Sequence, residues 1–231
     1  MGATGKQKLT PMMAQYREAK SELTDDTLLL FRMGDFYELF FEDAVRGSEL
    51  LDVTLTKRQG VPMAGVPHHA LQDYLPRALA AGVKVAIAEQ MEDPKEAKGL
   101  VKREVTQIIT PGTVIEGDVL DSGRSNFLAA VCRGRGEHYG IACLDLSTAE
   151  FRLTEIDGLD ELVHELTRLS PAECLVPDDL HAAWQEDGLP EALQPLLWTP
   201  LDGWIFAPDV AAERLQTHFD VATMDGFGCR G

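Results

Sequence analysis

The stretch TLLLFRMGDFYELFF, residues 27–41, joins a short apolar run to a turn and then to four closely spaced aromatic residues. Residues 27–33 have the composition of a buried strand. Gly34 and Asp35 form a turn signal. Apolar residues at helical spacing follow over residues 37–51. The stretch therefore predicts a buried strand, a tight turn and a helix.

Two residues of this stretch, Phe36 and Glu38, have a role that the pattern leaves open. Asp35 and Glu38 have the spacing of a capping box, in which both residues only satisfy backbone N–H groups. On such a helix Phe36 lies roughly 95° from the centre of the apolar stripe, at the edge of the core or outside it. An exposed Phe can wedge between base steps in the minor groove of DNA, and a Glu can hydrogen-bond to a base edge.

Helices and strands are predicted to alternate around this stretch. Thr10 followed by Pro11 predicts a helix start, with a capping hydroxyl and a proline at the first helical position. Further along we expect a strand at 53–58, a turn-rich segment at 60–69, a helix at 70–82, and strands at 83–90 and 102–112. This alternation predicts an α/β or α+β domain.

The second half of the chain predicts a different domain. Residues 110–126 are rich in Gly, Ser, Thr and Asp and have the composition of a linker. Three meandering strands are expected over residues 127–156, followed by a helix at 159–169 and a strand at 172–177. This order opens many α/β folds, the ribonuclease-H-like fold included.

The formal net charge of −17 is spread unevenly over the 231 residues. Residues 1–120 hold 14 Lys and Arg against 18 Asp and Glu, a balance of −4. Residues 121–231 hold 7 against 20, a balance of −13. The first half can therefore approach an anion such as DNA, whereas the second half repels anions and suits a protein partner.

Two further features bear on compartment. The chain has no run of 18 or more apolar residues, and its N-terminus lacks the apolar region of a signal peptide. We therefore expect a cytoplasmic protein with no membrane span.

The four cysteines are Cys132, Cys143, Cys174 and Cys229. They form no C-x-x-C pair, so we expect buried thiols and neither disulfides nor metal ligands.

Several motifs resemble the N-terminal part of the MutS family of DNA mismatch repair proteins. They are PMMAQYREAK (11–20), LLLFRMGDFYELFFEDA (28–44), LTKR (55–58), VPMAGVPHHAL (61–71), VAIAEQMEDP (85–94) and QIITPGT (107–113). A looser similarity continues to DGFG (225–228). The resemblance implies a mismatch-recognition domain at residues 1–112, a linker at 113–126 and a connector domain at 127–231 that is truncated at its C-terminus.

The resemblance also implies a fold and a set of site residues. The fold is α/β, with an α+β mixed-sheet N-terminal domain followed by a ribonuclease-H-like α/β connector domain. In this family the Phe of the DFYE motif, here Phe36, stacks on a mispaired or unpaired base from the minor groove. The Glu two residues later, here Glu38, bonds to that base. The other implied DNA contacts are Met33, Asp35, Lys57 and Arg58.

By the same resemblance, the chain is a non-catalytic fragment of an ATP-dependent mismatch sensor. It contains no G-x-x-x-x-G-K-[ST] phosphate loop. We therefore expect no catalytic residues, no metal site and no cofactor, because ATP and Mg²⁺ belong to the full-length family member. The implied partners are mismatched duplex DNA and, through the connector, a MutL-like protein. Full-length members form homodimers, whereas this chain is expected to be monomeric, cytoplasmic and nucleoid-associated.

Two other functions stay open at this point. A metal-dependent nuclease would need several carboxylates to converge on Asp145, and Glu150 and Glu165 are the nearby candidates without a recognisable spacing. The second alternative is a protein-interaction module, in which the patch around Phe36 binds a protein and not DNA.

Three smaller motifs are expected to be structural. GFGCRG (226–231) matches the dinucleotide-binding pattern, but the sequence ends there, so no following helix or acidic residue supports that interpretation. His68 and His69 have no acid or thiol at ligand spacing beside them, so a structural or surface role is expected. Lys102 and Arg103 are expected to form a solvated strand end.

Overall fold

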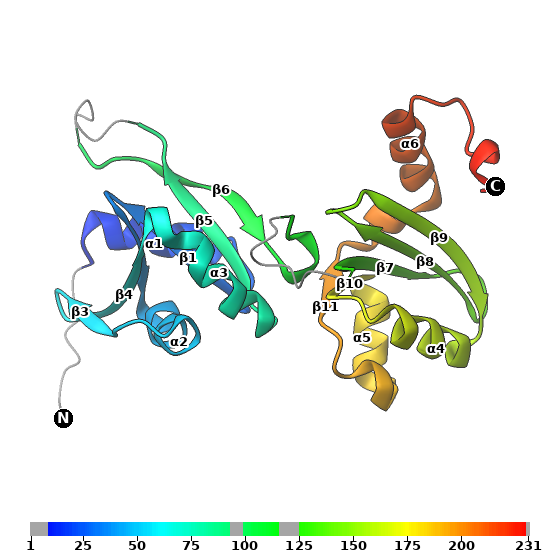
Figure 1. Ribbon diagram of the computed structural model, residues 1–231, viewed down its shortest axis with the longest axis horizontal. Coiled ribbons are helices and arrows are strands. Elements are labelled where there is room, and N and C mark those ends of the chain that lie inside the picture. The colour runs from blue at the N-terminus through cyan, green and yellow to red at the C-terminus, as the bar shows by residue number, and fades with distance from the viewer. Residues whose placement is uncertain (1–8, 93–98, 116–124, 230–231) are drawn as a thin grey trace. The chain divides into compact units, whose positions relative to one another are not determined.

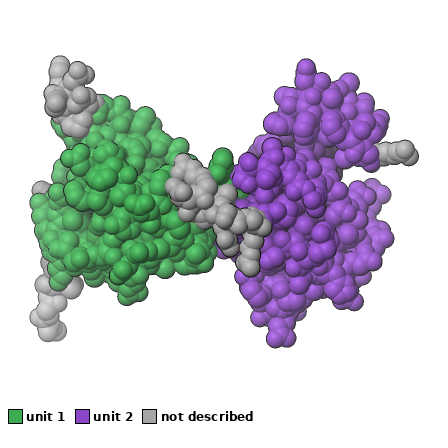
Figure 2. Space-filling model, viewed as in Figure 1, with its two compact units in different colours: residues 1–124 green, residues 125–231 purple. Residues whose placement is uncertain are grey.

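The computed structural model describes residues 9–92, 99–115 and 125–229. The chain folds as two compact units, residues 1–124 and residues 125–231, which Figure 2 distinguishes by colour. The two predicted domains fall in different units. Most of the predicted linker, residues 116–124, lies outside the described residues. No helix in the described parts of the chain has both the length and the apolar character needed to cross a membrane.

The first unit is built on a six-stranded sheet with the strand order β3-β4-β2-β1-β5-β6 (Figure 1). The strands are β1 Thr27–Met33, β2 Phe36–Phe40, β3 Thr56–Arg58, β4 Val61–Pro67, β5 Lys84–Gln90 and β6 Arg103–Ile109. The helices are α1 Pro11–Ser21, α2 Phe41–Leu51 and α3 Leu71–Ala80, with the 3₁₀ turns η1 His68–Ala70 and η2 Pro111–Thr113. β1 and β5 are parallel and the other neighbours are antiparallel, so the predicted mixed sheet is confirmed.

Both faces of this sheet are covered by helices. On one face Tyr37 and Leu39 of β2 belong to the core that contains α2 and α3. On the other face Phe31 and Phe40 pack edge-on against Tyr16 of α1, with ring centroids 5.4 and 5.2 Å apart. Because both faces of β2 are covered, apolar residues occupy both sides of the strand, and Glu38 is the one charged residue among them.

The helix predicted over residues 37–51 is wrong in its first part. Residues 36–40 form strand β2, and α2 begins only at Phe41. The capping-box interpretation of Asp35 and Glu38 is therefore wrong, and no side chain caps α2. Phe41 has a φ of 56°, which turns the chain sharply from strand to helix. Pairing of β2 with β1 and β4 on either side overrides the helical spacing of these residues.

The flanking elements differ from expectation in two places. The segment at 60–69, predicted to be turn-rich, forms β4 over Val61–Pro67, because its backbone pairs with β2 and β3. The strand predicted at 53–58 shortens to the three residues of β3. The strand at 27–33 is confirmed as predicted, and so is the helix start at Thr10, whose hydroxyl accepts a hydrogen bond from the Met13 amide.

The second unit holds a five-stranded sheet with the order β11-β10-β7-β8-β9. The strands are β7 Phe127–Arg133, β8 His138–Asp145, β9 Glu150–Asp157, β10 Glu173–Pro177 and β11 Trp198–Leu201. The helices are α4 Leu159–Leu169, α5 Asp178–Asp187 and α6 Pro208–Phe219, with the 3₁₀ turns η3 Glu191–Leu193, η4 Gly203–Phe206 and η5 Asp225–Phe227. The meander β7-β8-β9 is antiparallel, and β10 runs parallel to β7 and β11. The predicted meander, helix and strand are confirmed, as is the α/β class.

The four cysteines are free thiols. Cys143 and Cys174 are buried in the core of the second unit, where burial raises their pKa values to about 11 and about 12. Cys132 and Cys229 are only half-buried, which differs from the prediction that all four are buried.

Candidate nucleic-acid interface

Phe36 lies at the start of β2, directly after the two-residue turn of the β1–β2 hairpin. Gly34 has a φ of +60°, which a residue without a side chain adopts most easily, and which the first central position of a type II′ turn requires. Phe36 pairs with Met33 on one side and with Pro67 on the other. Phe36 is 47% exposed, so a large apolar ring projects into solvent from the turn end of a central strand.

Glu38 lies two residues further along β2 and therefore on the same face of the sheet as Phe36. It is only 8% exposed, between Phe31 of β1 and Gly65 of β4. Burial raises the pKa of Glu38 above its ordinary value of 4.5, and the positive charge of Arg58 opposes that increase. The two residues that the sequence singled out are thus adjacent on one face, one exposed and the other largely covered.

The guanidinium of Arg58 forms an ion pair with Glu38 and donates a hydrogen bond from Nη1 to Glu38 Oε2. Arg58 pairs with Val61, which lies on the Glu38 face of β4 because it is an even number of residues from Gly65. Lys57 pairs with Pro62 and so projects from the opposite face. The structure therefore brings Arg58 into the site and separates Lys57 from it, although both were expected together.

The turn carrying Asp35 is held by His68, the first residue of η1, directly after β4. The Asp35 carbonyl oxygen accepts a hydrogen bond of 2.9 Å from the backbone amide of His68, and His68 Nδ1 lies 3.3 Å from the same oxygen. Met33 is half-buried beside Phe36, whereas the Asp35 side chain is exposed. Sequence reasoning gave His68 no particular place, and its position beside the hairpin follows only from the β2–β4 pairing.

Arg103 was predicted to form a solvated strand end, and this prediction is wrong. Arg103 is 8% exposed and donates hydrogen bonds to Arg32 O (2.6 Å), Val101 O (2.9 Å) and Gln15 Oε1 (3.2 Å). Its guanidinium lies 5.2 Å from the ring centroid of Phe31. Desolvation lowers the pKa of Arg103, and the charge of Glu38 opposes this. The neighbouring Lys102 is exposed, as expected.

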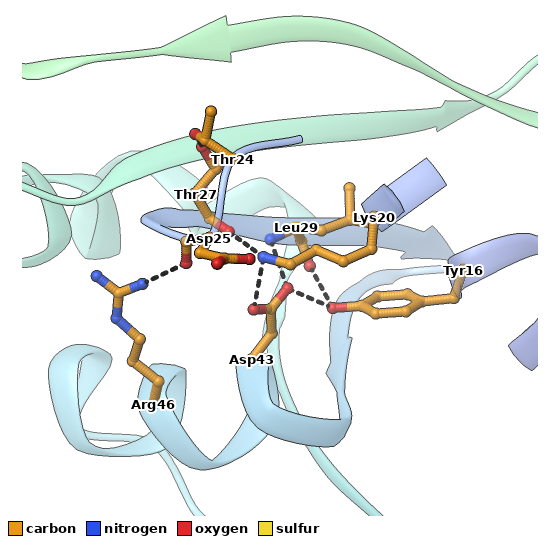
Figure 3. Close-up of polar contacts among 8 residues, drawn as sticks. All are labelled: Tyr16, Lys20, Thr24, Asp25, Thr27, Leu29, Asp43 and Arg46. Atoms are coloured by element: carbon orange, nitrogen blue, oxygen red, sulfur yellow. Dashed lines mark hydrogen bonds and ion pairs between the residues drawn. The ribbon is translucent and has the colours of Figure 1, made fainter. Parts of the chain in front are cut away.

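A buried polar network lies on the same side of the sheet, where α1 packs (Figure 3). Asp43, in the first turn of α2, accepts hydrogen bonds from Tyr16 Oη (2.9 Å), Lys20 Nζ (2.9 Å) and the Leu29 amide (3.0 Å). Tyr16 and Lys20 belong to α1, and Leu29 belongs to β1. The network therefore ties both helices to β1, the strand that pairs with the strand of Phe36.

Among the described residues of the second unit, no cluster of metal ligands forms around Asp145. Asp145 is buried, and its carboxylate accepts hydrogen bonds from the Ser147 hydroxyl (2.6 Å), the Ser147 amide (2.9 Å) and the Asn126 amide (3.2 Å). These contacts, the Ser147 hydroxyl first, lower the pKa of Asp145. Glu150 lies opposite Asp145 in the sheet. Within residues 9–92, 99–115 and 125–229, no three His, Cys, Asp or Glu residues gather as metal ligands, so Glu165 does not complete a site.

The rings of His68 and His69 meet edge-on at 5.7 Å. The start of GFGCRG lies in η5, and its last two residues are outside the described residues.

Comparison with known proteins identifies a family for both units. The family model "MutS domain I" matches residues 10–118, and "MutS domain II" matches residues 126–231. Similar proteins include the DNA mismatch repair protein MutS of Syntrophobacter fumaroxidans (49% identical over 230 residues), of Myxococcus xanthus (46% over 235) and of Methanosarcina acetivorans (42% over 241).

These alignments cover 97%, 98% and 96% of this chain, which spans only 26% of the length of each relative. The two matched domains correspond to the two compact units, and the first of them contains Phe36 and Glu38. The chain therefore belongs to the MutS family of DNA mismatch repair proteins, and its units are domains I and II of that family.

Proposed function

We propose that the first unit recognises mispaired or unpaired bases in duplex DNA by inserting Phe36 from the minor groove and probing the base with Glu38. Domain I is the mismatch-recognition domain of this family. The observation that carries the proposal is the position of Phe36, a 47% exposed ring on a central strand with a carboxylate two residues away on the same face. In this chain the function is binding and not catalysis.

The surroundings of Phe36 suit insertion into DNA. Wedging a side chain between base steps requires a few kcal/mol of unstacking energy, which is least where the stacking is already weakened by a mispair. A ring that is fixed in place before binding loses little conformational entropy on insertion. The turn before Phe36 is held by His68, and β2 is paired along both edges.

In this proposal Glu38 accounts for the discrimination between mispaired and matched duplexes. An ionised carboxylate is repelled by phosphates, so it weakens binding to every duplex. It recovers that loss only where a base edge exposed by the wedge can hydrogen-bond to it. Burial raises the pKa of Glu38, so protonating this carboxyl group costs less free energy than protonating an exposed glutamate. The protonated group can donate a hydrogen bond to a base.

The other contacts belong to the same proposal. Met33 and Asp35 flank the wedge, and Arg58 and Lys57 approach phosphates from the two faces of β3. The acidic second unit faces a MutL-like protein. ATP and Mg²⁺ binding, homodimer formation and association with the nucleoid belong to the full-length protein.

An NMR titration of the isotope-labelled 231-residue chain tests the proposal. A short duplex with one G·T mispair and its matched counterpart are added separately at low salt, because binding is expected to be weak and strongly salt-dependent. We expect larger shifts with the mispaired duplex, centred on the amides of Phe36 and Glu38. The preference should disappear in Phe36→Ala.

A matched control is Phe227→Ala, which removes a 58% exposed ring from the second unit. This variant should keep the preference for the mispair. Equal shifts with both duplexes in the unmodified chain would refute mismatch recognition by this chain. If neither duplex shifts signals around Phe36, the patch binds something other than DNA, and the protein-interaction alternative is favoured.

A further inference from the structure

Glu38 is approached by arginines from both edges of the sheet. Arg58 comes from β3 at one edge, and Arg103 comes from β6 at the other. Arg58 donates directly to the Glu38 carboxylate, whereas Arg103 contributes through its charge. Both positive charges stabilise the ionised form of a carboxylate that is largely removed from water.

The two arginines differ in how firmly they are held. Arg103 is buried, donates to three acceptors and lies over the ring of Phe31. The Arg58 side chain is 43% exposed and extends from a strand of three residues. A long exposed side chain at an edge strand exchanges partners easily, so Arg58 can leave Glu38 and Arg103 cannot.

The strand next to Glu38 carries no side chain at Gly65. Gly65 lies opposite Glu38 on β4, and a Cβ atom there would lie 3.0 Å from the Tyr37 carbonyl oxygen and 3.6 Å from Glu38 Cγ. The absence of a side chain at this position leaves room above the strand between β3 and β2. As a result Glu38 Oε2 is covered by the guanidinium on the face where Phe36 projects.

We propose that Arg58 is a specificity-determining positioning residue, which covers Glu38 in the free chain and moves to a DNA phosphate when a mispair is bound. A phosphate replaces the carboxylate as the partner of the guanidinium, and the uncovered Glu38 turns to the base beside Phe36. At a matched step the ring does not insert and Glu38 gains no new partner, so Arg58 stays on Glu38. The inference rests on the proposed function.

This exchange has a consequence for salt dependence that simple phosphate binding lacks. Each phosphate neutralised by a protein contributes about −0.9 to the slope of log affinity against log salt concentration. If Arg58 reaches a phosphate only in the mispaired complex, the slope for the mispaired duplex is steeper by about 0.9. A roughly fourfold increase in salt then weakens mispaired binding about threefold more than matched binding.

The experiment measures both slopes for the 231-residue chain, for Arg58→Met and for Lys57→Met. Lys57 is the matched control, since it is the adjacent residue with the same charge on the opposite face of β3. We expect the slope difference to vanish in Arg58→Met and to persist in Lys57→Met, which should lower both slopes equally. The ¹³C signal of the Glu38 carboxyl group should shift on addition of the mispaired duplex and not of the matched one.

The outcomes separate this inference from the function on which it rests. If Phe36→Ala removes the mispair preference but Arg58→Met and Lys57→Met change both slopes alike, Arg58 is an ordinary phosphate contact and the exchange is refuted. If the unmodified chain shows no preference for the mispair, the proposed function fails and the exchange fails with it. A Glu38 signal that moves equally with both duplexes also overturns the exchange.

Discussion

The substitution Asp43→Ala tests whether the polar network of Asp43, Tyr16, Lys20 and Leu29 holds the first unit together. Asp43 is 5% exposed, and three donors from two elements converge on its carboxylate (Figure 3). Truncation removes all three acceptor contacts at once. The three donors differ in the other hydrogen-bond partners that they can reach. The availability of those partners determines how much the free energy of unfolding falls.

The Leu29 amide is the most costly of the three donors to leave without its acceptor. A buried donor without a partner costs about 1–3 kcal/mol. The single O–H of Tyr16 can donate instead to the Leu29 carbonyl oxygen, which lies 3.2 Å from Oη, so its loss is about 1 kcal/mol. Lys20 is 25% exposed along its side chain and can turn to water. We therefore expect Asp43→Ala to lower the free energy of unfolding of the first unit by about 2–4 kcal/mol, and Tyr16→Phe to lower it by about 1 kcal/mol.

Urea unfolding followed by two probes measures this effect. All three tryptophans, Trp184, Trp198 and Trp204, are in the second unit, so their fluorescence reports that unit alone. Amide NMR signals from β1 and β5 report the first unit. Asp43→Ala should lower the urea midpoint of the amide signals and leave the tryptophan transition unchanged.

Two results would contradict the reasoning. A loss of less than about 0.5 kcal/mol, the range of ordinary surface substitutions, would mean that Asp43 is not a necessary acceptor. A loss in Tyr16→Phe equal to that in Asp43→Ala would mean that packing of the tyrosine, and not the carboxylate, holds α1 in place.

Three further predictions concern the hairpin and its surroundings. Gly34→Ala should destabilise the first unit by about 1 kcal/mol, because φ is +60° there. No atom lies within 4 Å of an added Cβ, so the cost comes from the backbone conformation and not from a clash. Thermal unfolding measures the loss, with the more tolerant Gly34→Asn as control. Arg103→Met should cost about 1–3 kcal/mol in urea unfolding, because it strips the Arg32 carbonyl of a donor, whereas a similar loss in the exposed Lys102→Met would contradict this. The pKa of Glu38 is raised in the folded state, so its stabilising contribution is complete below the ordinary pKa of 4.5 and is lost as pH rises through the folded value. The unmodified chain should therefore lose stability relative to Glu38→Gln between acidic and neutral pH, and parallel pH profiles would refute this.

Local sequence patterns were sufficient for several elements. The apolar run at residues 27–33 lies between polar and turn residues, and a strand inside a sheet that is covered on both faces has that composition. Thr10 and Pro11 start α1 because a capping hydroxyl and a preset φ act within one turn. The exposure of Phe36 was also predicted, although from a helix that is absent; the strand exposes it instead because it lies beside the turn.

The sequence by itself determined which residues could carry the chemistry, because the turn at Gly34, the exposed Phe36 and a nearby carboxylate are all local features. Only the tertiary structure decided how they are arranged. Pairing between strands distant in sequence made residues 36–40 a strand, and the register of β3 on β4 placed Arg58 over Glu38 and Lys57 on the opposite face. Side chains alternate between faces with a period of two, so a shift of one residue in that register would have exchanged them. No local pattern contains the register, since it is set by contacts across the whole sheet.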